Sequence, residues 1–169
     1  MRTRPSVKGV DHVGIAAQNP EALANFYHEV LGLAIVGRGR MNGEGVRTSV
    51  FLGRQAGTAA HQMTIYADPA MRHTAFRVAT LAALRALYQL IIARAIPVRW
   101  VLNHGVSLAF YFSDPASNLI KLYWSTGIAY PQPHGHPIDL SQSETALMQD
   151  VANLMAQFKL SKEGNSGLA

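Results

Sequence analysis

The chain contains no cysteine among its 169 residues. This absence excludes a disulfide framework and any metal site built from thiolates. No apolar stretch approaches the ~18 residues that span a bilayer, and no apolar segment of the signal-peptide type follows the first residues. We therefore expect a cytoplasmic protein that does not associate with membranes.

Charged residues are also few, at 15% of the chain, and the formal net charge is +5. The 15 Lys and Arg residues are scattered, and no basic run alternates with aromatic residues, so we expect no nucleic-acid partner. The glycines at 37, 39, 43 and 45 precede a predicted strand instead of a helix, which excludes a phosphate-binding loop. The positive field would still attract small anionic or phenolate ligands.

What the sequence does contain is a weak internal repeat with an offset of 61 residues. Aligning residues 11–31 with residues 72–92 places His12 on His73. Each copy has the pattern of a short apolar strand, a break and a helix with apolar residues at helical spacing. Two equivalent strands can bring their histidines together across a pseudo-twofold axis. The repeat therefore predicts a shared site, and paired histidines are typical of metal sites.

The predicted elements follow the order βαβββ twice. The first helix covers residues 19–31, with Asn19 as its N-cap and Gly32 as its stop, and the second covers residues 81–93. The predicted strands are residues 10–17, 33–37, 46–52, 61–66, 72–78, 98–102, 106–112 and 119–124. No helix separates the last three strands of either unit, which argues against a doubly wound nucleotide-binding sheet.

The remaining residues, 127–169, are predicted to form a Pro/Gly/His-rich extension and a C-terminal amphipathic helix. Ser141 and Glu144 suggest a capping box at the start of this helix. In the extension, His134 and His136 either bind a metal or belong to a segment draped over the surface. We expect one domain at residues 8–126, with modules at 8–66 and 72–126.

The duplicated βαβββ units, each with a histidine near the start of its first strand, resemble the vicinal oxygen chelate superfamily. This group includes glyoxalase I, fosfomycin and bleomycin resistance proteins, and extradiol ring-cleaving dioxygenases. The segment from Asn103 to Pro115 resembles the extradiol signature, in which a histidine precedes an apolar–Tyr pair, an Asp-Pro turn and a closing glutamate. The resemblance implies an α+β fold in which the two modules form a cupped eight-stranded mixed sheet, followed by the C-terminal helix.

The resemblance also implies a metal site. His12 and His73 would be two ligands of Fe(II), and Lys121 occupies the position of the third, where the family has glutamate. Mn(II) or no metal are the alternatives, because an ammonium group adds positive charge and offers no lone pair. Lys121 would lose its proton, swing outward, or take the empty metal position by donating to both histidines.

Three further residues correspond to catalytic positions of the extradiol enzymes. His104 would lie beside the substrate hydroxyl, Tyr111 would be the nearby phenol donor, and His61 would handle protons and steady dioxygen. A register slip of one residue would turn His61 to the other face of its strand. Ser117 replaces the glycine that follows the signature's Asp-Pro turn, and Asn118 can still support that turn.

The resemblance leaves three functional hypotheses. The first is an Fe(II)-dependent extradiol-type dioxygenase that acts on a small catecholic aromatic and O2. The second is a metal-free protein that binds small aromatics, which accounts for Lys121. The third is a glyoxalase-type metalloenzyme, which needs a carboxylate at position 121 as well and does not need the His104–Tyr111 pair. In each case we expect a homo-oligomer.

Overall fold

The structure is a computed structural model that describes residues 6–40, 48–57 and 61–166. The first half of the chain forms β1 (Val7–Ala16), α1 (Pro20–Leu31), β2 (Ala34–Arg40), β3 (Thr48–Gly53) and β4 (Met63–Tyr66). The second half forms a short 3-10 turn η1 (Pro69–Met71), β5 (His73–Val78), α2 (Leu81–Ala93), β6 (Val98–Asn103), β7 (Ser107–Ser113) and β8 (Leu119–Ser125). A two-residue strand β9 (His136–Pro137) and the helix α3 (Glu144–Ser166) follow. The first two residues of the strand predicted at 46–52 lie outside the described residues.

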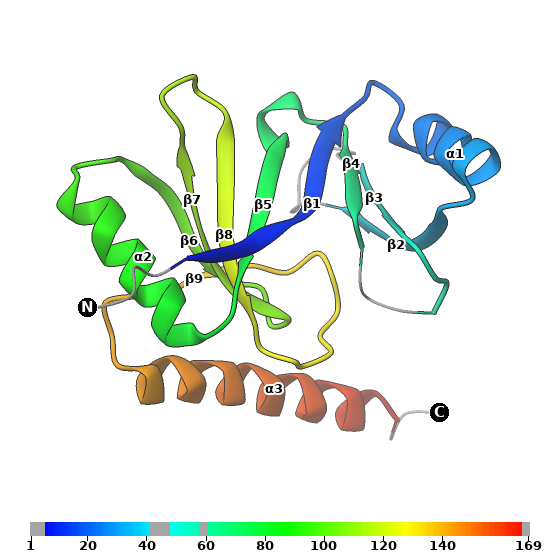
Figure 1. Cartoon of the computed structure of the whole chain (residues 1–169). Helices are drawn as coiled ribbons and strands as arrows, with labels where there is room; N and C mark the ends of the chain where they lie inside the picture. The colour runs from blue at the N-terminus through cyan, green and yellow to red at the C-terminus, as the bar shows by residue number, and fades with distance from the viewer. Residues whose placement is uncertain (1–5, 41–47, 58–60, 167–169) are drawn as a thin grey trace.

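The nine strands of the described residues belong to one mixed sheet in the order β2-β3-β4-β1-β5-β8-β7-β6-β9 (Figure 1). β1 is parallel to β4, β5 is parallel to β8, and β1 and β5 are antiparallel to each other. Apart from β9, the order is therefore symmetric about the β1–β5 pair, as a pseudo-twofold axis requires. The predicted α+β fold of two βαβββ units with a C-terminal helix is confirmed, with β9 as an addition at the β6 edge. We keep the proposed modules at 8–66 and 72–126, since β1–β4 lie in the first and β5–β8 in the second.

Local capping signals explain where the helices begin and end. The Asn19 side chain accepts a hydrogen bond from the Ala22 N–H at the start of α1, and Gly32 ends the helix with a left-handed φ of 69°. At α3 the predicted capping box is wrong. The Ser143 hydroxyl accepts from the Ala146 N–H, whereas Ser141 hydrogen-bonds to the carboxylate of Asp139 in the preceding turn.

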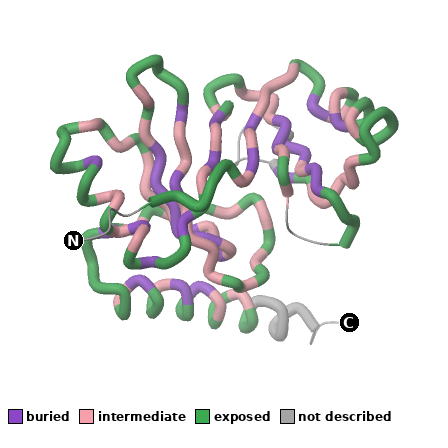
Figure 2. Tube along the Cα trace, in the orientation of Figure 1, coloured by how far each residue is buried: buried purple, intermediate pink, exposed green. Residues whose placement is uncertain are grey.

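The larger core lies between α2, α3 and one face of the second half of the sheet. Its members include Leu84 of α2, Leu108, Phe110 and Leu122 of the sheet, and Leu147 and Val151 of α3. Buried and exposed stretches alternate along α3, as expected for a helix with one face on the core (Figure 2). Because strand side chains alternate between faces, Ala109 and Tyr111 of β7 point to the opposite side, where they form a separate cluster with Leu119. That second face carries the candidate site.

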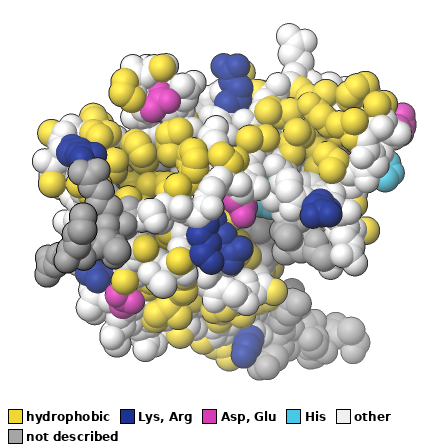
Figure 3. All heavy atoms as spheres, viewed as in Figure 1, with side chains coloured by type: hydrophobic (Ala, Val, Ile, Leu, Met, Phe, Trp, Pro, Cys, Tyr) yellow, Lys and Arg dark blue, Asp and Glu magenta, His cyan; other side chains and the backbone are white. Residues whose placement is uncertain are grey.

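On the surface, basic side chains lie apart from one another on the face shown in Figure 3 and form no continuous stripe. An apolar area covers the α1 end of this face, and α1 exposes Phe26, Val30 and Leu31. Self-association stays a prediction. Within the described part of the chain, no helix combines the length and the apolar character needed to cross a membrane.

Candidate functional site

Four neighbouring strands contribute one row of side chains to the site. His12 of β1 is in register with Ala75 of β5, Ala75 with Lys121 of β8, and Lys121 with Tyr111 of β7. Residues in register project to the same face of a sheet, and so do residues two apart along a strand. His73, two positions before Ala75, therefore joins the row. The structure thus brings together His12, His73, Lys121 and Tyr111 at the junction of the two halves.

The two repeat-related histidines meet through their Nε2 atoms, which are 3.4 Å apart. Both side chains are buried, with exposed fractions of 5% for His12 and 7% for His73. Nδ1 of His12 lies 3.2 Å from the Asp11 carboxylate, and Nδ1 of His73 lies 2.8 Å from the Met71 carbonyl oxygen. These oxygens can only accept, so each Nδ1 donates and each Nε2 of a neutral ring carries a lone pair. Two nitrogens with free lone pairs are therefore close enough together to contact one ligand.

Burial also keeps these rings neutral. Desolvation, followed by the positive charge of Lys121, lowers the pKa of His73 to about 4. The same two causes, in the same order, lower the pKa of His12 even further. Neither histidine carries a charge at neutral pH, which is the state that a metal ligand needs.

A glycine makes room for the pair. Gly14 is in register with His73, and a Cβ at this position would lie 2.6 Å from Nδ1 of His73 and 2.9 Å from the Tyr66 ring. The ring of His73 therefore rests on bare backbone. Any side chain at position 14 would force this ring to shift.

Lys121 stays within the site and does not swing out. Its side chain is half-buried, and Nζ lies 5.6 Å from the centre of the Tyr111 ring and 5.4 Å from that of Tyr123. Burial lowers the pKa of Lys121 to about 8, against the opposing effect of Asp11. The ammonium group of this residue is therefore easier to deprotonate than that of an exposed lysine.

His104 and Tyr111 form a hydrogen-bonded pair beside the histidines. The Tyr111 hydroxyl donates to Nε2 of His104 at 3.0 Å, because Nδ1 of His104 donates to the carbonyl oxygen of His134. Burial is the main cause that lowers the pKa of His104 to about 3 and raises that of Tyr111 well above its usual value. The Tyr111 ring lies 6.1 Å from the ring of His73, so the pair adjoins the first two histidines.

His61 lies just before β4 and faces the same site. Its ring centre is 4.6 Å from that of His12 and 5.1 Å from that of Phe51. The one-residue slip considered from the sequence does not turn this ring away. His134 and His136 are separate from this group, since they contact the far side of His104 and α3.

Sequence reasoning missed Tyr66, whose ring lies 5.9 Å from that of His73. Burial raises the pKa of Tyr66 to about 12, so its hydroxyl stays protonated. Tyr66 pairs with Ala16 in the first half as Tyr123 pairs with Arg77 in the second, so the two tyrosines are related by the pseudo-twofold axis. Aligning the fourth strand of each unit, and not only the first, would have found it.

The donor set fits a metal ion in part. The Nε2 separation of 3.4 Å is shorter than two metal–nitrogen bonds of ~2.1 Å, so one ion can contact both rings. However, the described residues contain no group of three His, Cys, Asp or Glu side chains placed to hold a metal. Two histidines are present, and the carboxylate that would complete a two-histidine, one-carboxylate iron site is replaced by Lys121.

Comparison with known proteins gives the class. The chain belongs to the Glyoxalase/Bleomycin resistance protein/Dioxygenase superfamily, whose family model matches residues 9–122. No curated protein matches the chain by sequence.

Solved structures of two kinds share the fold. The 2,3-dioxygenase LapB from Pseudomonas sp. KL28 is 18% identical, with a TM-score of 0.61 over 79% of this chain and 47% of its own. A catechol 2,3-dioxygenase is 24% identical, with a TM-score of 0.58 over 78% and 45%. Methylmalonyl-CoA epimerase from Mycobacterium tuberculosis is 22% identical, with a TM-score of 0.53 over 75% and 93%. The chain thus spans about half the length of these dioxygenases and most of the epimerase, and at these identities the likeness establishes the fold alone.

Proposed function

We propose that this chain is an extradiol-type ring-cleavage dioxygenase that acts on a small catecholic aromatic with O2, using Fe(II) held by His12 and His73, with Mn(II) as the alternative metal. The observation that carries the proposal is that the unprotonated Nε2 atoms of His12 and His73 lie 3.4 Å apart. The His104–Tyr111 pair beside them adds the proton-handling groups that this chemistry requires. An isomerase or thiol transferase of the glyoxalase type would leave that pair without a role.

The metal, when bound, would supply electron transfer between the catecholate and O2. The other steps belong to the side chains. The single lone pair of Nε2 of His104 accepts from the Tyr111 hydroxyl, so a substrate hydroxyl would pass its proton to His104 through Tyr111 or after taking the place of the Tyr111 hydroxyl. The low pKa of His104 makes it a weak base in the free protein, and the negative charge of a nearby catecholate raises that pKa. The rings of Tyr66 and Tyr123 provide flat walls near the histidines for the aromatic ring.

A second candidate is a metal-free protein that binds a flat aromatic anion, and Lys121 is the observation that favours it. Its Nζ lies within about 6 Å of the ring centres of both Tyr111 and Tyr123, so a phenolate or carboxylate would find a cation with two aromatic rings nearby. This candidate accounts for Lys121, whereas the dioxygenase accounts for the four histidines and Tyr111.

One set of measurements separates the two candidates. Protein loaded anaerobically with Fe(II), with its iron content measured, is mixed with catechol or 2,3-dihydroxybiphenyl in air. The dioxygenase predicts oxygen uptake and a yellow ring-opened product. His104→Ala should lower turnover more than it weakens binding, because a positioned proton acceptor acts mainly in the transition state. His28→Ala, which removes an exposed histidine on α1, is the matched control.

The outcomes are distinct. Absence of oxygen uptake by wild type and by Lys121→Glu, with iron bound in both, would eliminate the dioxygenase. Binding of catechol to metal-free protein that Lys121→Ala weakens would establish the binder.

A further inference from the structure

The segment between β8 and α3 follows the family match, which ends at residue 122, and yet contacts His104. We propose that this segment, residues 130–136, together with Asp150 of α3, is a positioning element that fixes the tautomer of His104. The inference deepens the proposed function, because it concerns the proton acceptor of that site. It assigns a role to a part of the chain beyond the two modules.

The segment holds His104 from two sides. Nδ1 of the imidazole donates to the carbonyl oxygen of His134, and the side-chain amide of Gln132 donates to the carbonyl oxygen of His104 at 2.8 Å. A Cβ at Gly135 would lie 3.3 Å from the imidazole, so the ring rests against this part of the backbone. A neutral imidazole has two tautomers, and the His134 carbonyl stabilises the one whose bare Nε2 faces Tyr111.

Packing keeps the segment in contact with the residue after His104. Gly105 has a left-handed φ of 76°, and a Cβ there would lie 2.4 Å from the Tyr130 ring. The glycine therefore allows Tyr130 to pack directly on the backbone. The Tyr130 ring also contacts that of Phe158 in α3, with 5.2 Å between ring centres. Tyr130 thus links α3 to the turn that carries His104.

One carboxylate oxygen of Asp150 connects α3 to the residues around His104. Oδ2 of Asp150 accepts from the side-chain amide of Asn103 at 2.8 Å and from Nε2 of His136 at 3.0 Å. Asn103 is fully buried, and its own amide oxygen accepts from the Gly105 N–H at 2.7 Å. Asp150 therefore joins α3 to β9 and to the residues on both sides of His104.

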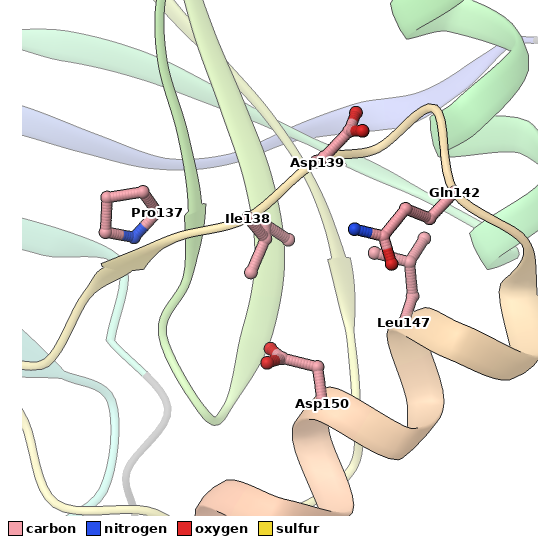
Figure 4. A pocket seen from close by; sticks show the side chains of 6 residues that line it. All are labelled: Pro137, Ile138, Asp139, Gln142, Leu147 and Asp150. Atoms are coloured by element: carbon pink, nitrogen blue, oxygen red, sulfur yellow. The ribbon is translucent and has the colours of Figure 1, made fainter.

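Figure 4 shows the surroundings of this carboxylate. Asp150 lines a cavity of about 280 Å³ with Pro137, Ile138, Asp139, Gln142 and Leu147. Asp139 also lines this cavity, and its carboxylate accepts hydrogen bonds from Ser141 in its own turn. It provides a matched control, because it is a second carboxylate at the same cavity that lies outside residues 130–136 and bonds to Ser141 instead of Asn103 or His136.

The test is nitrogen NMR of the imidazole rings in the full-length, metal-free protein at neutral pH. The shifts of Nδ1 and Nε2 distinguish the two tautomers, and a His104→Gln variant assigns the signal. In wild type we expect His104 to be protonated at Nδ1. In Asp150→Ala the Nδ1–H population should fall and the Nε2–H population should rise, because the carbonyl that favours the first tautomer is no longer held in place. Asp139→Ala should match wild type.

His12 and His73 serve as internal references, because Asp11 and Met71 hold their Nδ1 atoms independently of the segment. Loss of the His104 tautomer with unchanged shifts at His12 and His73 supports a positioning role. Wild-type shifts at His104 in Asp150→Ala, or equal changes in all three rings, would overturn it.

Gln132→Leu removes a direct contact and answers the same question if Asp150→Ala does not fold. It should increase the other tautomer of His104, and an unchanged His104 spectrum in this variant contradicts the proposal. The readout needs neither iron nor turnover, so its failure is distinguishable from failure of the dioxygenase proposal.

Discussion

Replacing Lys121 with methionine should tighten divalent metal binding at acidic pH and remove its dependence on pH. A dication beside the histidines strongly disfavours a neighbouring ammonium group, so Lys121 must first lose its proton. With a pKa of about 8, that loss costs about 2.7 kcal/mol at pH 6, about 1.4 at pH 7 and about 0.4 at pH 8. The affinity of the wild type should therefore rise by about 50-fold between pH 6 and pH 8. His73, with a pKa of about 4, adds nothing in this range.

The assay is a titration with Co²⁺, followed by visible absorption or calorimetry in buffers that do not chelate the metal. Lys121→Met should bind Co²⁺ with the same affinity at pH 6 and pH 8. Lys121→Glu should bind more tightly than Lys121→Met, because it adds an anionic ligand. Lys159→Met, which removes an exposed lysine from α3, should show the same rise in Co²⁺ affinity between pH 6 and pH 8 as the wild type. The reasoning would be refuted if the Co²⁺ affinity of the wild type did not change between pH 6 and pH 8. It would also be refuted if the affinity of Lys121→Met rose with pH as much as that of the wild type.

Three further predictions concern stability and the geometry of the site. Gly14→Ala should cost about 1–3 kcal/mol in urea denaturation and abolish Co²⁺ binding, since its Cβ would lie 2.6 Å from Nδ1 of His73; unchanged metal affinity would contradict the close approach. Ser117→Gly should stabilise the fold by about 0.5–1 kcal/mol, because Ser117 has a left-handed φ of 66° that glycine adopts without steric cost; a loss of stability would show that the serine side chain contributes. The unfolding free energy should fall as the pH drops from 6.5 toward about 4, because the pKa of His73 is lowered from 6.5 to about 4 and the unfolded chain takes up protons first. In the double variant His12→Asn/His73→Asn the unfolding free energy should depend less on pH in this range, and an unchanged pH dependence would show that other groups cause it.

The features marked by a local signal or by the internal repeat could be predicted from the sequence. Asn19 and Gly32 mark the ends of α1 because an N-cap side chain and a left-handed glycine act within one helical turn. The 61-residue repeat also indicated that His12 and His73 share a site, since equivalent strands of a duplicated unit become neighbours. The register of the strand at His61 could not be fixed in this way, and only the ring contacts of His61 with His12 and Phe51 show which face it takes.

The features that depend on distant contacts could not be predicted. β9 forms only because residues 136–137 pair with the edge of β6, and two residues carry no strand pattern of their own. Ser141 and Ser143 are both acceptable caps by composition, and the bond from Ser141 to Asp139 decides between them. The carbonyl that holds His104 lies 30 residues away, and a backbone oxygen leaves no mark in the sequence.

The antiparallel pair β1–β5 has a consequence for the energetics of ligand binding. One imidazole of the site comes from each side of this pair, so a ligand that contacts both acts as a non-covalent cross-link between the two halves of the sheet. Such a ligand binds only when the halves are joined, and its binding free energy is added to the stability of their junction. Occupancy of the site and cohesion of the duplicated fold are therefore thermodynamically linked. A mutation that loosens the β1–β5 pair should weaken ligand binding even where it touches no residue of the site.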